Sequence, residues 1–122
     1  MYTFLKKPAL FDGYVLSSFY LFKESLTAQF ERELAANPAL RTEARGGPVC
    51  LFVAVGTKDP YDRDGVSTKR GAAFLESLQK VVPKSVRVET KVYEGEGHVP
   101  YASFYDGLRW IYSCAKLGPV KP

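Results

Sequence analysis

Long apolar runs, cysteine and histidine are all scarce in this chain of 122 residues. The two longest apolar stretches, residues 15–22 and 48–55, fall well short of the roughly 20 residues that a bilayer-spanning helix needs, so we expect no membrane segment. The start of the chain lacks the apolar stretch and the small-residue cleavage site of a secretory signal. These absences predict a cytoplasmic protein.

The scarcity of cysteine and histidine also excludes most metal sites. Cys50 and Cys114 form no Cys-x-x-Cys pair, and with His98 as the only histidine they cannot supply the four ligands of a structural zinc site. Cys50 opens an apolar run and Cys114 falls late in a helical pattern. We therefore expect two small, buried side chains in a reduced protein, with a disulfide as the open alternative, and no metal or organic cofactor.

The residues that are present have an ordinary globular composition, with 46% hydrophobic and 25% charged. Lysine and arginine number 17 against 13 acidic residues, a net charge of +4. The cations are spread singly or in pairs, so we expect no nucleic-acid partner. The length, without an internal repeat or linker, predicts one domain over residues 1–122.

Apolar periodicity divides the chain into alternating strands and helices. Strands are predicted at Gly13–Ser17, 48–55 and Val86–Tyr93, and helices at 23–36, 67–82 and 101–116, after a short helical end at 1–7. The run 48–55 is continuously apolar, which is typical of a strand covered on both faces in a parallel sheet. This order predicts an α/β fold, with a short, mostly parallel sheet of three strands flanked by helices.

The last predicted helix is rich in large apolar side chains. Its periodicity predicts a buried face made of Phe104, Leu108, Ile111 and Ala115. We expect the aromatic residues Phe104, Trp110 and Tyr112 to belong to the core rather than to a ligand-binding surface.

Polar side chains follow each predicted strand. Ser17 and Ser18 follow the first, Asp59 the second and His98 the third. Because ligands bind beyond the carboxyl ends of the strands in open α/β sheets, these residues are the candidate functional residues.

Several segments resemble one family. Residues 53–59 (VAVGTKD) and 95–98 (GEGH) resemble the final third of an α/β-hydrolase. Residues 7–18 (KPALFDGYVLSS) and 104–112 (FYDGLRWIY) are similar to the esterase family that contains the esterase-D-like and siderophore-ester hydrolases. The resemblance covers nearly the whole chain. It implies the carboxyl-terminal part of a carboxylic-ester hydrolase that acts on a small-molecule ester.

The resemblance also implies roles for two residues. His98 matches the general base, and Asp59 matches the acid that orients it. Asp62, Asp64 or no acid at all stay open as alternatives to Asp59.

The sequence lacks the Gly-x-Ser-x-Gly elbow that carries the nucleophile in such hydrolases. Ser17 and Ser18 are the candidate substitutes, and Ser103 is a further one. Three interpretations stay open: a fragment without catalysis of its own, an enzyme that uses a nonstandard serine or a serine of another chain, and a noncatalytic interaction domain on a hydrolase scaffold. The strand that would pair with Gly13–Ser17 is also missing, so we expect a homo-oligomer through this apolar edge strand.

Overall fold

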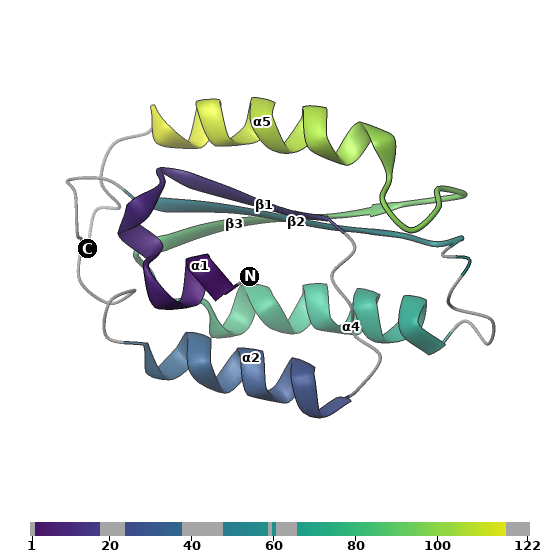
Figure 1. Ribbon diagram of the computed structural model, residues 1–122, viewed down its shortest axis with the longest axis horizontal. Coiled ribbons are helices and arrows are strands. Elements are labelled where there is room, and N and C mark those ends of the chain that lie inside the picture. The colour runs from purple at the N-terminus through teal and green to yellow at the C-terminus, as the bar shows by residue number, and fades with distance from the viewer. Residues whose placement is uncertain (1, 18–23, 38–47, 59, 61–65, 117–122) are drawn as a thin grey trace.

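The computed structural model describes residues 2–17, 24–37, 48–58, 60 and 66–116 (Figure 1). Its elements are, in order, α1 (Tyr2–Lys6), the 3-10 helix η1 (Pro8–Leu10), β1 (Gly13–Ser17), α2 (Glu24–Ala36), β2 (Val49–Gly56), α4 (Val66–Val81), β3 (Val86–Tyr93) and α5 (Tyr101–Ala115). The strands form one sheet in the order β1-β2-β3, and both pairings are parallel. The predicted α/β class, with a three-stranded parallel sheet flanked by helices, is confirmed.

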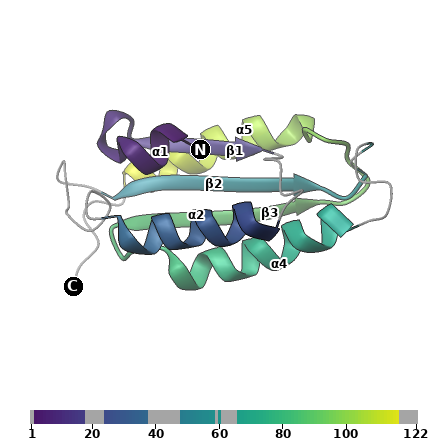
Figure 2. The same cartoon turned by 60° about the horizontal axis from the view of Figure 1, so that its bottom comes forward.

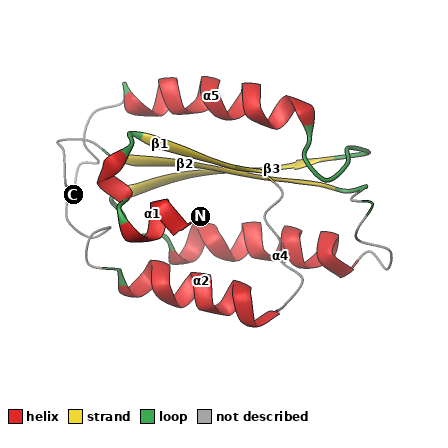
Figure 3. Cartoon of the chain, viewed as in Figure 1, coloured by secondary structure: helices red, strands yellow, loops and turns green. Residues whose placement is uncertain are grey.

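The helices lie in two layers, one on each face of the sheet (Figure 3). Right-handed crossovers that step across a sheet in one direction place their helices on the same face. Accordingly, α2 and α4 run side by side below the sheet in Figure 1, where α1 lies on the same side, and Figure 2 again shows α2 and α4 side by side. Helix α5 returns over the opposite face and contacts β1 and β2. None of the helices in the described ranges is long and apolar enough to cross a membrane.

The lower face of the sheet carries the larger core. Leu51, Val53 and Val55 alternate onto this side of β2 and are buried. They pack with buried side chains from α1, α2 and α4, namely Phe4, Leu5, Phe30, Leu34, Phe74, Leu75 and Leu78. In the predicted helices 23–36 and 67–82, apolar residues at helical spacing therefore face this core, among them Phe30, Leu34 and Leu78.

The upper face carries a smaller core, in which Phe52, Ala54 and Tyr93 are buried. Helix α5 covers it with small residues, because its buried side is formed by Ser103, Gly107 and Cys114. A Cβ atom on Gly107 would lie 2.8 Å from Cγ2 of Val15 and 3.0 Å from Cδ1 of Phe52. Glycine at this position therefore allows α5 to lie close to the sheet.

The predicted core face of α5 is wrong for Phe104, Leu108 and Ala115, which are exposed, whereas Ile111 is half-buried and lies against Gly13. Phe104 is 65% exposed and Tyr112 is 70% exposed, while Trp110 is partly buried and packs near Phe52, with ring centroids 6.4 Å apart. The prediction chose the large residues because apolar spacing reflects hydrophobicity and carries no information about the space between the helix and the sheet. Close approach to the sheet instead selects the small residues one position earlier, such as Ser103 in place of Phe104.

The expectation of two reduced cysteines is also wrong. Cys50 and Cys114 form a disulfide, with their Cα atoms 6.2 Å apart. Cys50 lies near the start of β2, and α5 runs back over the sheet towards that end, so its last turn reaches this residue. The pair is 64 residues apart in sequence, so only the return path of α5 brings the two cysteines together.

Candidate functional site at the carboxyl ends of the strands

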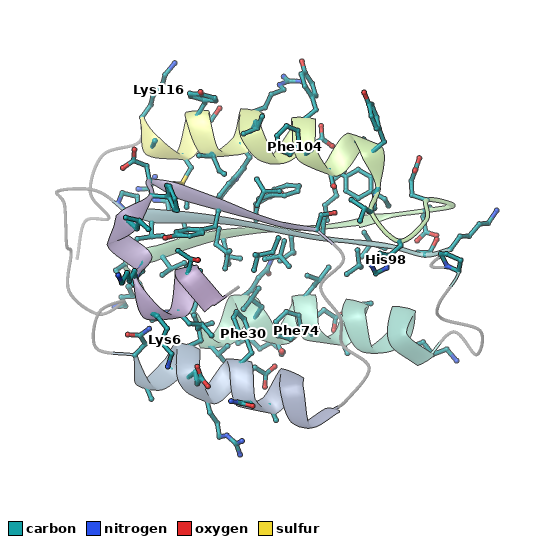
Figure 4. The ribbon with its side chains drawn as sticks, in the orientation of Figure 1. Lys6, Phe30, Phe74, His98, Phe104 and Lys116 are labelled. Atoms are coloured by element: carbon teal, nitrogen blue, oxygen red, sulfur yellow. A yellow bond between two sulfur atoms is a disulfide. The ribbon has the colours of Figure 1, made fainter. Side chains whose placement is uncertain are left out.

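His98 lies in the loop that joins β3 to α5, at the end of the sheet where the parallel strands finish (Figure 4). Strands β3 and β1 are the two edges of the sheet, so this loop passes the end of β2 on its way to α5. It contacts β2 near Gly56, and the first turn of α5 then reaches Ser17 at the end of β1. The ends of all three strands therefore meet around the loop that carries His98.

The end of β2 is packed directly against the backbone of the His98 loop. A Cβ atom on Gly56 would lie 2.1 Å from the carbonyl oxygen of Gly97 and 2.6 Å from that of Glu96. Only glycine permits this approach. Two residues further on, the backbone N–H of Lys58 donates a hydrogen bond of 2.7 Å to the carbonyl oxygen of Glu96.

This hydrogen bond connects the two chain segments that carry the predicted acid and base. Lys58 immediately precedes Asp59, and Glu96 lies two positions before His98. Asp59 lies outside the described residues, as do the alternative acids Asp62 and Asp64.

Thr57 also holds the loop in place. Its hydroxyl accepts a hydrogen bond of 2.8 Å from the backbone N–H of Gly95 and donates one of 3.2 Å to the Glu94 carboxylate. Gly95 has a φ of 76°, a left-handed conformation that favours glycine and turns the chain directly after β3. Thr57 was not predictable as part of the site, because nothing in the sequence of a polar loop shows which hydroxyl faces the neighbouring turn.

The Ser17 hydroxyl is occupied by a hydrogen bond to α5. Its Oγ atom lies 2.7 Å from Oγ of Ser103, whose own hydroxyl donates a bond of 2.6 Å to the carbonyl oxygen of Pro100. A hydroxyl carries one proton, so Ser17 is the donor to Ser103. Ser103 is fully buried, and its contacts join β1 to the first turn of α5. The other candidate nucleophile, Ser18, lies outside the described residues.

An ionic cluster ties α5 to the edge strand β3. Lys91 and Tyr93 both donate hydrogen bonds of 2.6 Å to the same oxygen, Oδ2 of Asp106. The bonds from Lys91 and then Tyr93 lower the pKa of Asp106. Burial, together with the neighbouring carboxylate, raises the pKa of Tyr93 well above its usual value. Lys91 also lies 4.7 Å from the centre of the Tyr93 ring.

Within the described ranges, no three histidine, cysteine or acidic side chains gather in a group that could hold a metal ion. No protein-family model, curated protein or solved structure matches the chain. The resemblance to esterases therefore stays a prediction from the sequence segments, and the fold shows only an α/β domain with a short parallel sheet.

Proposed function

We propose that this chain provides the acid and base of a carboxylic-ester hydrolase, with His98 as the general base and Asp59 as the acid that orients it. The observation that supports this proposal most is the contact between the end of β2 and the His98 loop. The hydrogen bond from Lys58 to Glu96 and the close approach of Gly56 to Gly97 hold Lys58, which precedes Asp59 in the sequence, against the loop that carries His98.

The reaction needs a serine hydroxyl as nucleophile. Its oxygen attacks the ester carbonyl carbon while its proton passes to His98, and the departing alcohol then takes that proton. Water next attacks the acyl group, gives a proton to His98 and frees the acid, and the serine recovers its proton. We assign the nucleophile to Ser17, to Ser18 or to a serine of another chain. Ser17 can act only after it breaks its hydrogen bond to Ser103.

Hydrolysis of a short-chain p-nitrophenyl ester tests the proposal. We expect His98→Ala and Asp59→Asn each to lower kcat by several orders of magnitude, since removal of a triad member costs about 10⁴-fold. Asp12→Asn makes the same chemical change at an exposed residue at the opposite end of β1, so it should leave kcat unchanged. A rate that is equal in all variants would come from a contaminant and would refute the proposal.

Two glycine variants test whether the contact at the end of β2 positions His98. Gly56→Ala places a methyl group against the Gly97 carbonyl and should lower kcat more than tenfold. Gly97→Ala is the matched control, because its Cβ atom would meet only the carbonyl oxygen of Lys58, at 3.8 Å. Circular dichroism serves as the control that both variants are folded. Equal activity in the two variants would show that this contact does not position His98.

A phosphonylating reagent identifies the nucleophile, because it labels a serine activated by a neighbouring base. Intact mass should show one adduct, and peptide mapping should place it on Ser17 or Ser18 if the nucleophile is in this chain. Ser17→Ala and Ser18→Ala separate the two, with Ser113→Ala on the exposed side of α5 as the control. Labelling that persists in His98→Ala would exclude His98 as the activating base.

A second candidate is a noncatalytic interaction domain on the same scaffold. The exposed aromatic side chains of α5 favour it, because an interaction domain needs an uncovered apolar surface. A folded wild-type protein that neither hydrolyses esters nor takes the phosphonate label would support this candidate over the hydrolase.

The remaining predictions concern partners and compartment. The position of β1 at one edge of the sheet supports the proposed homo-oligomer through Gly13–Ser17. The absence of a nucleic-acid partner stays a prediction. The cytoplasmic location stays a prediction as well, and the Cys50–Cys114 disulfide weighs against it, because disulfides persist mainly in oxidising compartments.

A further inference from the structure

Helix α5 has a second apolar surface, which points away from the sheet. Its members recur at intervals of three and four residues, so they lie along one side of the helix. These residues, the α5 stripe, are Tyr101 (94% exposed), Phe104 (65%), Tyr105 (63%), Leu108 (37%) and Tyr112 (70%). In Figure 4, side chains stand off α5 on the side opposite the sheet.

The α5 stripe is large enough to hold a stable interface. An aromatic side chain buries about 200 Å² when fully covered, so the exposed parts of the stripe, extended by Val99, amount to about 700 Å². The largest apolar patch of a typical monomer is about 300–600 Å². Each partner in a standard protein interface contributes about 800 Å², so the stripe matches one half of such an interface.

Two charged side chains on the flank of the stripe, Asp106 and Arg109, already contact other groups of the chain. None of its five residues is charged. On the flank of the helix, the Asp106 carboxylate is already bonded to Lys91 and Tyr93. The guanidinium of Arg109 lies over the Tyr105 ring, 5.6 Å from its centre. An unpaired buried charge is the feature that most weakens an interface, so this surface suits a partner that is equally apolar.

We propose that the α5 stripe binds the same stripe of a second copy of this chain, with the two helices antiparallel across a two-fold axis near Leu108. A two-fold interface uses one surface twice, so the surface must complement itself. Phe104 and Tyr112 lie four positions before and after Leu108. Antiparallel packing therefore sets Phe104 against Tyr112 of the second copy, and the reverse. This contact is independent of the hydrolase proposal and differs from an association through β1.

Sedimentation equilibrium of the full chain at several concentrations tests the proposal. We expect wild type to dimerise at micromolar concentration, and Tyr112→Glu to raise the dimer Kd at least tenfold because it buries a carboxylate in the interface. Ser113→Glu adds the same charge one residue later, at an exposed position off the stripe, and should keep the wild-type Kd. Far-UV circular dichroism confirms that both variants are folded.

Three results would overturn the proposal. One is a wild type that stays monomeric at high micromolar concentration. Another is a dimer whose Kd is unchanged by Tyr112→Glu, which would show that the copies associate through the β1 edge or through another surface. The third is an equal loss of affinity in both variants, which would show that charge anywhere on α5 matters and that the stripe does not.

Discussion

The two faces of the sheet are stabilised in different ways. Below the sheet, three of the described helices bury large apolar side chains in one continuous core. Above it, α5 is joined to the sheet by small residues, by the Cys50–Cys114 disulfide and by the ionic cluster around Asp106. Apart from Trp110, which packs near Phe52, the aromatic side chains of α5 lie on its outer side instead. A helix can therefore be firmly attached to a sheet and still leave its most apolar surface exposed.

The largest effect on stability should come from removing the disulfide, which attaches α5 to the upper face of the sheet. Its ends are 64 residues apart, and a loop of that length corresponds to about 4 kcal/mol of chain entropy in the unfolded state. We expect Cys50→Ala with Cys114→Ala to lower the free energy of unfolding in urea by about 3–4 kcal/mol. Wild type in reductant should lose a similar amount, and the double variant should not respond to reductant. A reductant-insensitive wild type would contradict the pairing.

The next largest difference in stability should come from replacing one leucine on each side of the sheet by alanine. Leu78 of α4 is fully buried in the lower core, whereas Leu108 of α5 is 37% exposed. Leu78→Ala should cost about 3 kcal/mol, because it leaves a cavity. Leu108→Ala should cost less than about 1 kcal/mol in solutions dilute enough to keep the chain monomeric. Equal costs would mean that the outer side of α5 packs within the monomer.

Two glycine-to-alanine changes compare how closely the helices approach the sheet. Alanine in place of glycine favours a helix by about 1 kcal/mol. A Cβ atom on Gly71 of α4 meets Val55 at 3.3 Å, a contact that a small shift relieves, whereas one on Gly107 meets Val15 at 2.8 Å and Phe52 at 3.0 Å. Gly71→Ala should therefore be nearly neutral in urea unfolding, and Gly107→Ala should destabilise by about 1–2 kcal/mol. The opposite order would contradict the close seating of α5.

The smallest effect should be the pH dependence of the ionic cluster. The lowered pKa of Asp106 contributes stability that is present above about pH 4 and is lost as the pH falls through the lowered value. The raised pKa of Tyr93 contributes stability that is present below about pH 10 and is lost as the pH rises towards the raised value. Melting temperatures between pH 2 and pH 11 should show both losses, and Asp106→Asn should remove the acid loss and reduce the alkaline one, because burial still raises the pKa of Tyr93. An unchanged profile in the variant would place the titrating groups elsewhere.

Apolar periodicity predicted correctly those helices and strands whose large apolar residues are the ones that pack in the core. The continuous apolar run at 48–55 identified β2, which is buried from Cys50 to Gly56. Phe74, Leu75 and Leu78 identified the buried side of α4. These predictions succeeded because large apolar residues fill the space between α4 and the sheet. For α5 the same argument failed, because close contact with β1 and β2 favours small residues.

The site was predictable only in outline. His98 follows β3 and Ser17 ends β1, as the order of elements indicated. The Thr57 hydrogen bonds and the bond between Ser17 and Ser103 depend on the path of one loop across the end of β2. Sequence spacing carries no information about that path, and the same is true of the Cys50–Cys114 pair.

The central claim is that α5 presents its apolar side to a second copy of the chain. Disulfide trapping at Leu108 tests this claim most directly. A residue beside a two-fold axis meets its own copy, and both native cysteines are already paired with each other. Under mild oxidation we expect Leu108→Cys to form a covalent dimer in high yield on a non-reducing gel, whereas Ser113→Cys, on the exposed flank of the same helix, stays monomeric. Equal yields from the two variants, or no dimer from Leu108→Cys at concentrations where wild type self-associates, would contradict the claim.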